Sequence, residues 1–378
     1  MAYTTIDNGE EAFQAFKYTG TGNTGATLAR TFNGSVNLKP GIHWHVKISS
    51  SNKHSILETE YLGAGVHWLS DSGDAKGGSY SGGTNENLAS FDTNGFTHNT
   101  TNQGSYYHNE NEKEYVTWNW AETGASNSSN SNGTISSTVR VHPSAGYSFV
   151  SWTGTSADGT IGHGLGAKPR AVWVFPIQVS ANNGNTQRVW WWQGNSDGYN
   201  IRNDLNSSQL VESNSSNGIV TADPSGEGTS TVFSVKEGNS SFENVNHSSQ
   251  NYMAICWKEI QGFSRFSFFH GNGQTDGTFV YCGFKPALIF IRAMDRAEGT
   301  FAYDNARNPT NDETSYVVNV TDTGGNLADT NTRLDILSTG FKLRDDGPAR
   351  NNNGTKYGFC AWAENPFVTS TGVPTTAR

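Results

Sequence analysis

The chain has 378 residues, with 34 acidic and 25 basic side chains and a formal net charge of −9 at pH 7. Glycine occurs 43 times, only 34% of the residues are hydrophobic and 16% are charged. This balance excludes a mainly helical protein, because Gly, Asn, Ser and Thr stand where good helix formers would be needed. It also excludes a disordered chain, because aromatic residues reach 12% and disordered chains are poor in them.

The same composition excludes several functional classes. Nucleic-acid binding is not expected, because contacts with phosphates need clusters of Lys and Arg. No apolar run of about 18 residues occurs, so we expect no membrane insertion. The first residues lack the charged and apolar regions of a secretory signal peptide. The three cysteines cannot all pair, which indicates a chain made in a reducing cytoplasm.

An internal comparison identifies three copies of one unit. Each copy begins with an aromatic strand that runs into a Gly-rich turn. A Lys-Pro pair before an apolar strand follows, and the copy ends with a closing motif of Tyr, four residues, Trp, one residue and Glu. The unit length suits a small β domain. We therefore predict an all-β protein of three tandem β-sandwich (jelly-roll-like) modules.

The first module is predicted over residues 13–122, after an N-terminal arm of residues 1–12. Lys39-Pro40 precedes its apolar strand, where the missing N–H of proline costs no ladder bond. In the closing strand Trp118 and Trp120 alternate with polar residues, which predicts a half-buried strand with both tryptophans on one face. The closing motif of this module is Tyr115, Trp120 and Glu122.

His43 and His45 lie at positions i and i+2 of the strand after Lys39-Pro40, so their side chains point to one face. Such a pair could supply two metal ligands. No third ligand is evident nearby, so a solvent-facing or hydrogen-bonded strand face is the favoured interpretation. The acidic turns at Asp71 and Asp345 could bind Ca²⁺, but they lack EF-hand spacing. We predict no metal site and no cofactor.

A polar linker is predicted over residues 123–146, because Thr123 to Gly133 is a low-complexity run of Ser, Asn and Gly. The second module follows over residues 147–259. Its closing motif is Tyr252, Trp257 and Glu259.

Three successive tryptophans, residues 190–192, occur inside the second module. Alternate side chains of a strand point to opposite faces, so these three cannot all face one core. If Trp191 faces outward, it is a candidate for stacking on a sugar ring or packing against another subunit. A strand covered by a neighbouring domain explains the run equally well.

The third module is predicted over residues 263–364 and should abut the second, because only three residues separate them. The run from Ala287 to Ile291 is continuously apolar, which indicates a strand buried on both faces. The closing motif is Tyr357, Trp362 and Glu364. We predict an extended C-terminal tail over residues 365–378.

The repeated Glu122, Glu259 and Glu364 raise the alternative of an acid pair for glycoside hydrolysis. Their recurrence in every copy favours a structural role, because a catalytic residue need not be triplicated. No Gly-x-Ser-x-Gly motif marks a nucleophile. We predict no catalytic residues and no enzyme activity.

Further motifs occur in a fixed order from the second module onward. They are Phe149-Val-Ser-Trp-Thr-Gly154, Gly162-His-Gly-Leu-Gly-Ala-Lys-Pro169, Phe263-Ser-Arg-Phe266, Asp276-Gly-Thr-Phe-Val-Tyr-Cys-Gly-Phe-Lys-Pro286, Gly340-Phe-Lys-Leu-Arg344 and Ala363-Glu-Asn-Pro-Phe367. Together they resemble a family of structural proteins of tailed bacteriophages, closest in style to those of phages of marine bacteria and cyanobacteria. The resemblance covers roughly residues 140–367. The first module, with Phe32 to Gly41 in place of the His-Gly-Leu-Gly turn, joins it through the repeat alone.

The members of that family contain a domain of unknown function and are usually labelled tail fibre or virion structural protein. The resemblance implies a component of the virion, in a tail fibre or appendage, that attaches to a host-surface glycan or receptor. A capsid decoration or head-fibre protein is the first alternative, and a glycan depolymerase is the second. The implied partners are other virion proteins and the host glycan or receptor, with a possible homo-oligomer such as a trimer.

Overall fold

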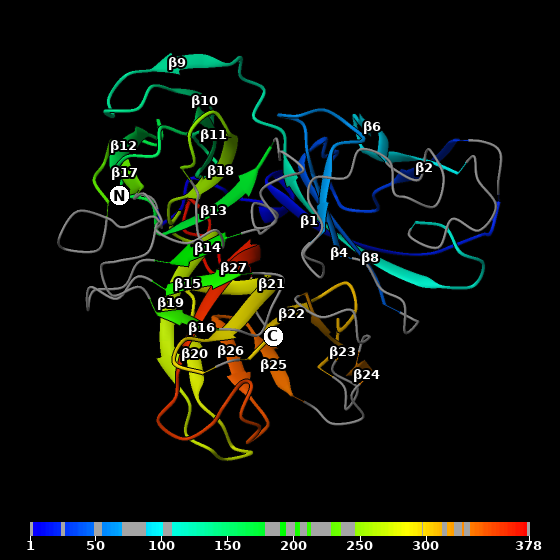
Figure 1. Ribbon diagram of the computed structural model, residues 1–378. Helices are drawn as coiled ribbons and strands as arrows, with labels where there is room; N and C mark the ends of the chain where they lie inside the picture. Colours follow the sequence, from blue (N-terminus) through cyan, green and yellow to red (C-terminus); the bar gives the residue numbers. More distant parts are fainter. Residues whose placement is uncertain are drawn as a thin grey trace. The chain divides into compact units, whose positions relative to one another are not determined.

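The computed structural model consists of antiparallel β-sheets (Figure 1), which confirms the all-β prediction. It describes residues 3–23, 27–48, 55–69, 88–100, 108–177, 190–193, 201–204, 210–212, 228–235, 246–296, 298–311, 316–320, 327–328 and 333–375. Within these ranges the one helical element is a 3-10 turn, η1 (Gly9–Glu11). No helix in the described part of the chain is long and apolar enough to cross a bilayer.

The first module has a large sheet and a small sheet. The large sheet has the order β1-β8-β3-β4-β5. Its strands are β1 (Phe13–Thr19), β3 (Pro40–Lys47), β4 (Ser55–Thr59), β5 (His67–Leu69) and β8 (Glu114–Ala121). The small sheet has the order β2-β7-β6. It consists of β2 (Thr27–Thr31), β6 (Leu88–Asp92) and β7 (Gly95–Asn99).

The second module has a large sheet of order β16-β15-β14-β13-β18-β11-β10-β9 and a pair β12-β17. The large sheet contains β9 (Ser128–Asn130), β10 (Ser137–His142), β11 (Tyr147–Thr153), β13 (Ala171–Pro176), β14 (Trp190–Gln193), β15 (Ile201–Asp204), β16 (Leu210–Glu212) and β18 (Asn251–Trp257). The pair consists of β12 (Gly159–Gly162) and β17 (Val232–Val235).

The third module has a large sheet of order β19-β27-β21-β22-β23-β24 and a small sheet of order β20-β26-β25. The large sheet contains β19 (Ser264–His270), β21 (Phe284–Ala293), β22 (Thr300–Asp304), β23 (Tyr316–Asn319), β24 (Leu327–Ala328) and β27 (Lys356–Pro366). The small sheet contains β20 (Phe279–Tyr281), β25 (Leu334–Leu337) and β26 (Gly340–Leu343).

All three modules share one strand arrangement. In each, the closing strand lies between the opening strand and the Lys-Pro strand, as in β1-β8-β3, β11-β18-β13 and β19-β27-β21. A smaller sheet or strand pair accompanies each large sheet. Apolar side chains from both form a core, for example Tyr18, Phe32 and Phe96 in the first module and Trp152, Ile161 and Phe233 in the second. The repeated motifs of the sequence therefore occupy equivalent strands.

The chain divides into two compact units, one formed by the first and third modules and the other by residues from Thr123 to Glu259. In the first unit, tryptophans of one large sheet contact aromatic side chains of the other. Trp44 lies 5.2 Å from Phe290 between ring centroids, and the indole N–H of Trp118 donates to Asp304 at 2.9 Å. Modules that are not consecutive in sequence thus share a buried interface.

The closing strand of the first module differs from the prediction of a half-buried strand. Trp118 and Trp120 do share one face, as predicted, but Thr117 and Asn119 on the other face are also fully buried. The reason is that the small sheet covers that face: Phe96 of β7 contacts His43, and His43 bonds to Asn119. Polar residues on a strand therefore did not mark a solvated face here.

Residues 123–146 are not the linker that the sequence predicted. They contain β9 and β10, and β10 pairs with the opening strand β11 of the second module. Thr138, Val139 and Val141 provide the β-branched side chains that favour a strand. Strands at a sheet edge tolerate the polar neighbours that suggested a linker.

The C-terminal tail is not simply extended. After β27 the chain turns between Val368 and Pro374, where the two residues form an isolated bridge. Ser370 in this turn donates to the carboxylate of Asp7 from its backbone N–H and from its hydroxyl, each at 2.6 Å. The N-terminal arm also contacts the third module, because the hydroxyl of Tyr3 donates to the carbonyl of Gly283 at 2.6 Å.

Candidate functional site

The repeated tyrosines hold the turn that leads into each closing strand. The hydroxyl oxygen of Tyr115 accepts a hydrogen bond from the backbone N–H of Glu110 at 2.9 Å. The two equivalent pairs are Tyr252 with His247 at 3.1 Å and Tyr357 with Asn352 at 2.9 Å. Burial raises the pKa of Tyr252 to about 12, so its hydroxyl stays protonated at neutral pH. The tyrosine of the closing motif is thus a structural residue.

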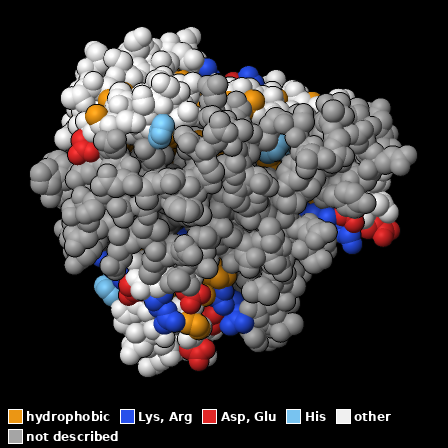
Figure 2. Space-filling model, in the orientation of Figure 1, with side chains coloured by type: hydrophobic (Ala, Val, Ile, Leu, Met, Phe, Trp, Pro, Cys, Tyr) orange, Lys and Arg blue, Asp and Glu red, His pale blue; other side chains and the backbone are white. Residues whose placement is uncertain are grey.

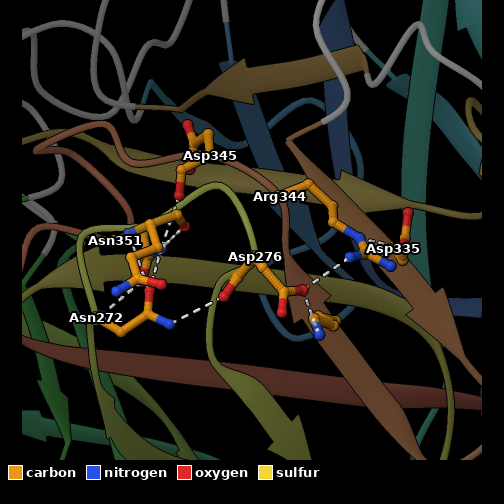
Figure 3. Close-up of polar contacts among 8 residues, drawn as sticks. Asn272, Asp276, Asp335, Arg344, Asp345 and Asn351 are labelled. Carbon is orange, nitrogen blue, oxygen red and sulfur yellow. Dashed lines mark hydrogen bonds and ion pairs between the residues drawn. The ribbon is translucent and has the colours of Figure 1, made fainter.

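A buried asparagine stands six residues before each tyrosine, at positions Asn109, Asn246 and Asn351. We call the segment from this asparagine to the tyrosine the Asn–Tyr turn. Figure 3 shows the third example: the Asn351 amide donates to the carbonyl of Asp345 at 2.7 Å and accepts from the N–H of Asn272 at 3.0 Å. Sequence reasoning missed these asparagines, although their constant spacing from the tyrosine was visible in all three copies.

The glycine that follows each opening strand packs against the Asn–Tyr turn. These glycines are Gly20, Gly154 and Gly271. A Cβ atom at any of them would overlap a backbone carbonyl of the turn, which explains why glycine recurs there. The Gly-rich turn of each module therefore packs directly against the turn that leads into its closing motif.

The tryptophans of the closing motif are core residues. Trp120, Trp257 and Trp362 are fully buried. Trp257 packs against Tyr147 and Trp173, with ring centroids 5.2 and 5.3 Å apart. Side chains of this size, buried in a tightly packed interior, contribute several kcal/mol each to stability.

The repeated glutamates form ion pairs near the Lys-Pro segment, which supports the structural interpretation. Glu122 pairs with Lys39 at 2.7 Å, and Glu259 pairs with Arg170 at 3.8 Å. Glu364 pairs with Lys285 at 2.7 Å. In the part of the chain that the structure describes, each of these carboxylates lies beside its own cation.

Glu364 has a further hydrogen bond beside its ion pair. Its carboxylate also accepts a hydrogen bond from Asn305 at 3.0 Å. Both residues line a groove in the third module with a volume of about 430 Å³. The groove wall consists of Phe279, Lys285, Asn305, Asn308, Pro309, Asn311, Ile336, Leu337, Ser338, Thr339, Glu364, Asn365 and Thr375.

Two asparagines of the groove wall differ in how their side chains are hydrogen-bonded. Asn311 is occupied by the backbone of Ile336, with bonds of 2.7 and 2.8 Å. The buried Oδ1 atom of Asn308, in contrast, has no hydrogen-bond partner among the described residues. A buried acceptor without a partner is costly, so a side-chain movement that brings Oδ1 of Asn308 to a ligand hydroxyl would be favourable.

An aromatic side chain stands at the groove. Phe279 lines it and is 47% exposed, and Tyr281 on the same face of β20 is 55% exposed. Exposed aromatic residues of this kind are uncommon on a solvated sheet and are typical of binding surfaces. This groove is the candidate binding site of the chain.

Charged side chains cover the neighbouring small sheet. Figure 2 shows Lys, Arg, Asp and Glu gathered where Figure 1 places β20, β25 and β26. Asp276 pairs with Lys342 at 2.7 Å, and Arg344 pairs with Asp335 at 2.6 Å (Figure 3). Asp345, considered above as a Ca²⁺ ligand, instead pairs with Arg350 at 2.9 Å. Its charge is therefore already balanced.

The structure places Trp191 in β14, opposite Trp173 of β13. Its side chain lies outside the described part of the structure, as does Asp71. The prediction that Trp191 binds a sugar or a subunit therefore stays a prediction.

The two histidines of β3 are fully buried, so the solvent-facing interpretation is wrong. Nδ1 of His43 lies 2.7 Å from Oδ1 of Asn119, which agrees with the hydrogen-bonded alternative. No third ligand was evident from the sequence, but His98 and His108 stand beside His45 in the structure. Sequence reasoning missed them because they come from β7 and from the turn before β8.

The comparisons with known proteins identify one family model and no further match. No curated protein and no solved structure matches the chain. One family model matches residues 8–366 and so spans all three modules, including the first. The chain therefore belongs to the family of the domain of unknown function DUF7483.

Proposed function

We propose that the chain is a virion structural protein of a tailed phage, a tail-fibre or appendage component that attaches to host-surface carbohydrate through the groove of its third module. The observation that carries this proposal is that one groove is lined both by the exposed Phe279 and by Asn308, whose Oδ1 has no hydrogen-bond partner among the described residues. The resemblance to phage structural proteins supplies the biological setting.

The chemistry of the groove suits a sugar. A pyranose ring has an apolar face that packs on an aromatic ring and a rim of hydroxyls that both donate and accept hydrogen bonds. Phe279 provides the aromatic surface. Amide and hydroxyl side chains along the wall, together with Glu364, provide acceptors and donors at fixed positions. Its volume of about 430 Å³ lies within the range of small-ligand sites.

The modules support a display role. The Asn–Tyr turn, the buried tryptophan and the ion pair recur in each module and fix its strands. A binding groove on such a rigid scaffold loses little entropy when it takes up a ligand. The pairing of Glu364 with Lys285 and Asn305 holds this wall of the groove in place.

Binding is tested with the purified full chain on an array of bacterial lipopolysaccharide and capsular oligosaccharides. We expect selective binding that Phe279→Ala and Asn308→Ala each weaken roughly tenfold, equivalent to about 1.4 kcal/mol. Phe367→Ala is the matched control, because Phe367 is an aromatic residue of the same unit, 38% exposed and outside the groove wall. Equal loss in the control, or no binding by the folded chain, would contradict the proposal.

A capsid decoration or head-fibre role is the second candidate. It is favoured by the packing of the first and third modules into one compact unit. Antibodies against the chain should label the tails of purified particles under the first proposal. Labelling confined to the head shell would favour decoration, and release of reducing sugars from bound glycan would favour a depolymerase.

A further inference from the structure

We propose that His45, His98 and His108 of the first module form a binding site for one divalent transition-metal ion, with Zn²⁺ as the expected occupant. One imidazole nitrogen from each residue lies within 4.8 Å of the other two. All three side chains are buried, with exposures of 0%, 0% and 1%. The site is independent of the groove in the third module.

The hydrogen bonds of Tyr18 define the tautomer of His45. The Tyr18 hydroxyl donates to the backbone carbonyl of His108 at 2.8 Å, since a carbonyl can only accept. Its oxygen lies 2.8 Å from Nε2 of His45, so Nε2 carries the hydrogen and donates to it. Nδ1 of His45 therefore holds the lone pair, and this buried atom has no hydrogen-bond partner in the described structure.

His98 is also buried without hydrogen bonds from its ring to any described residue. Neither of its ring nitrogens has a hydrogen-bond partner among the residues that the structure describes. Burial, together with repulsion from the neighbouring histidines, holds the pKa of His98 and of His45 well below the usual value. Both rings are thus neutral, which is the form that binds a metal ion.

The three ligands come from separate parts of the module. His45 lies on β3 of the large sheet, His98 on β7 of the small sheet, and His108 in the turn before β8. Ring centroids are 5.3 Å apart for His45 and His98, and 4.4 Å apart for His98 and His108. A Zn²⁺ ion with bonds of about 2.0–2.1 Å would draw the nitrogens closer together and join the two sheets.

The donor set determines the class of metal. Three neutral imidazoles without a thiolate or a carboxylate suit Zn²⁺ and its borderline neighbours, and they do not suit Ca²⁺ or Mg²⁺, which require oxygen ligands. The tyrosine behind His45 acts as the outer hydrogen-bond partner that orients metal-binding histidines.

The test uses the untagged full chain, unfolded with chelator and refolded with or without Zn²⁺. After desalting, elemental analysis should find one equivalent of zinc, and the Tm should exceed that of the metal-free chain. His98→Gln should retain less than a tenth of an equivalent, and its Tm should no longer respond to Zn²⁺. His67→Gln, a buried histidine of the same module outside the group, should retain one equivalent.

Two results would overturn the site: a wild-type chain that refolds but retains no zinc, or a His98→Gln chain that retains as much as the wild type. If His98→Gln does not fold, X-ray absorption of the zinc-loaded wild type decides. Scattering from three imidazoles supports the site. A shell of oxygen or sulfur atoms means adventitious binding and contradicts it.

Discussion

Trp120 and Trp362, the tryptophans of two closing motifs, meet edge to face with ring centroids 5.0 Å apart. Each closes its own module, yet both lie in one core, so equivalent faces of the first and third modules pack against each other. Phe13 extends the contact, with its ring 5.1 Å from that of Trp120. Such aromatic pairs add about 0.5–1.5 kcal/mol beyond the area that they bury.

Truncation of this contact should destabilise one unit of the chain and spare the other. We expect Trp120→Ala to lower the free energy of unfolding by about 3–5 kcal/mol, because it removes a fully buried side chain and leaves a cavity. Urea denaturation of the full chain should show the loss in the transition of the first and third modules. Trp257→Ala is the matched change in the second module. A Trp120→Ala chain as stable as the wild type would contradict the shared core.

Loss of the buried asparagine of an Asn–Tyr turn should also destabilise the chain. Asn351→Ala removes the buried amide that bonds to Asp345 and Asn272, and it leaves buried backbone groups unsatisfied at a cost of about 1–3 kcal/mol each. Asn353→Ala, two residues away and exposed, should change the midpoint of urea unfolding little. Equal effects of the two substitutions would show that the turn does not depend on Asn351.

The arrangement of strands was largely predictable from the sequence, because it depends on repeated local patterns. The Lys-Pro strand, the closing motif and the aromatic opening strand are visible in every copy. The fold class and the common face of Trp118 and Trp120 followed from these patterns. The strand β10 was missed because Thr138 and Val139 follow a long run of serine, asparagine and glycine, which outweighs a short alternating pattern.

The candidate sites were much less predictable, since their residues come from distant segments. Asn308 follows β22 and Phe279 lies on β20, and no spacing in the sequence connects them. His98 and His108 likewise meet His45 only after two sheets have paired. Local patterns reveal which segments form strands, whereas the meeting of such side chains depends on the tertiary fold.

Acid should destabilise the chain through its buried histidines. Burial lowers the pKa of His43 and of His163 to about 4 in the folded state, whereas the unfolded value is near 6.5. The unfolded chain therefore takes up protons first. The contribution of the neutral histidines to the free energy of unfolding is complete above pH 6.5 and is lost as the pH falls toward 4. For the fully buried His43 the loss is up to about 1.4 kcal/mol per pH unit.

Urea unfolding of the metal-free chain at pH 7 and pH 5 measures this effect. The loss of unfolding free energy between pH 7 and pH 5 should be smaller in His43→Gln, because glutamine cannot take up the proton. A pH dependence that His43→Gln leaves unchanged would show that His43 is not buried as described.

Glu58 should make the chain less stable at high pH, whereas the buried histidines make it less stable at low pH. Burial raises its pKa to about 8, while one carboxyl oxygen accepts from the N–H of Leu88 at 3.3 Å. The folded state thus keeps the proton, and stability falls as the pH rises from about 4.5 to about 8. Glu58→Gln should leave stability near the wild-type value at pH 5 and raise it by several kcal/mol at pH 9, at about 1.4 kcal/mol per unit of difference in pKa. Thermal unfolding of both chains at these two pH values checks the sign, and a destabilised variant at pH 9 would contradict a buried, protonated Glu58.

The most direct measurement is a crystal structure of the full chain with the oligosaccharide that it selects on the array. The account predicts a sugar ring against Phe279 with a hydroxyl on Oδ1 of Asn308. Sugar density on a different surface, such as one containing Trp191, would contradict the account, as would a groove that stays empty at saturating oligosaccharide.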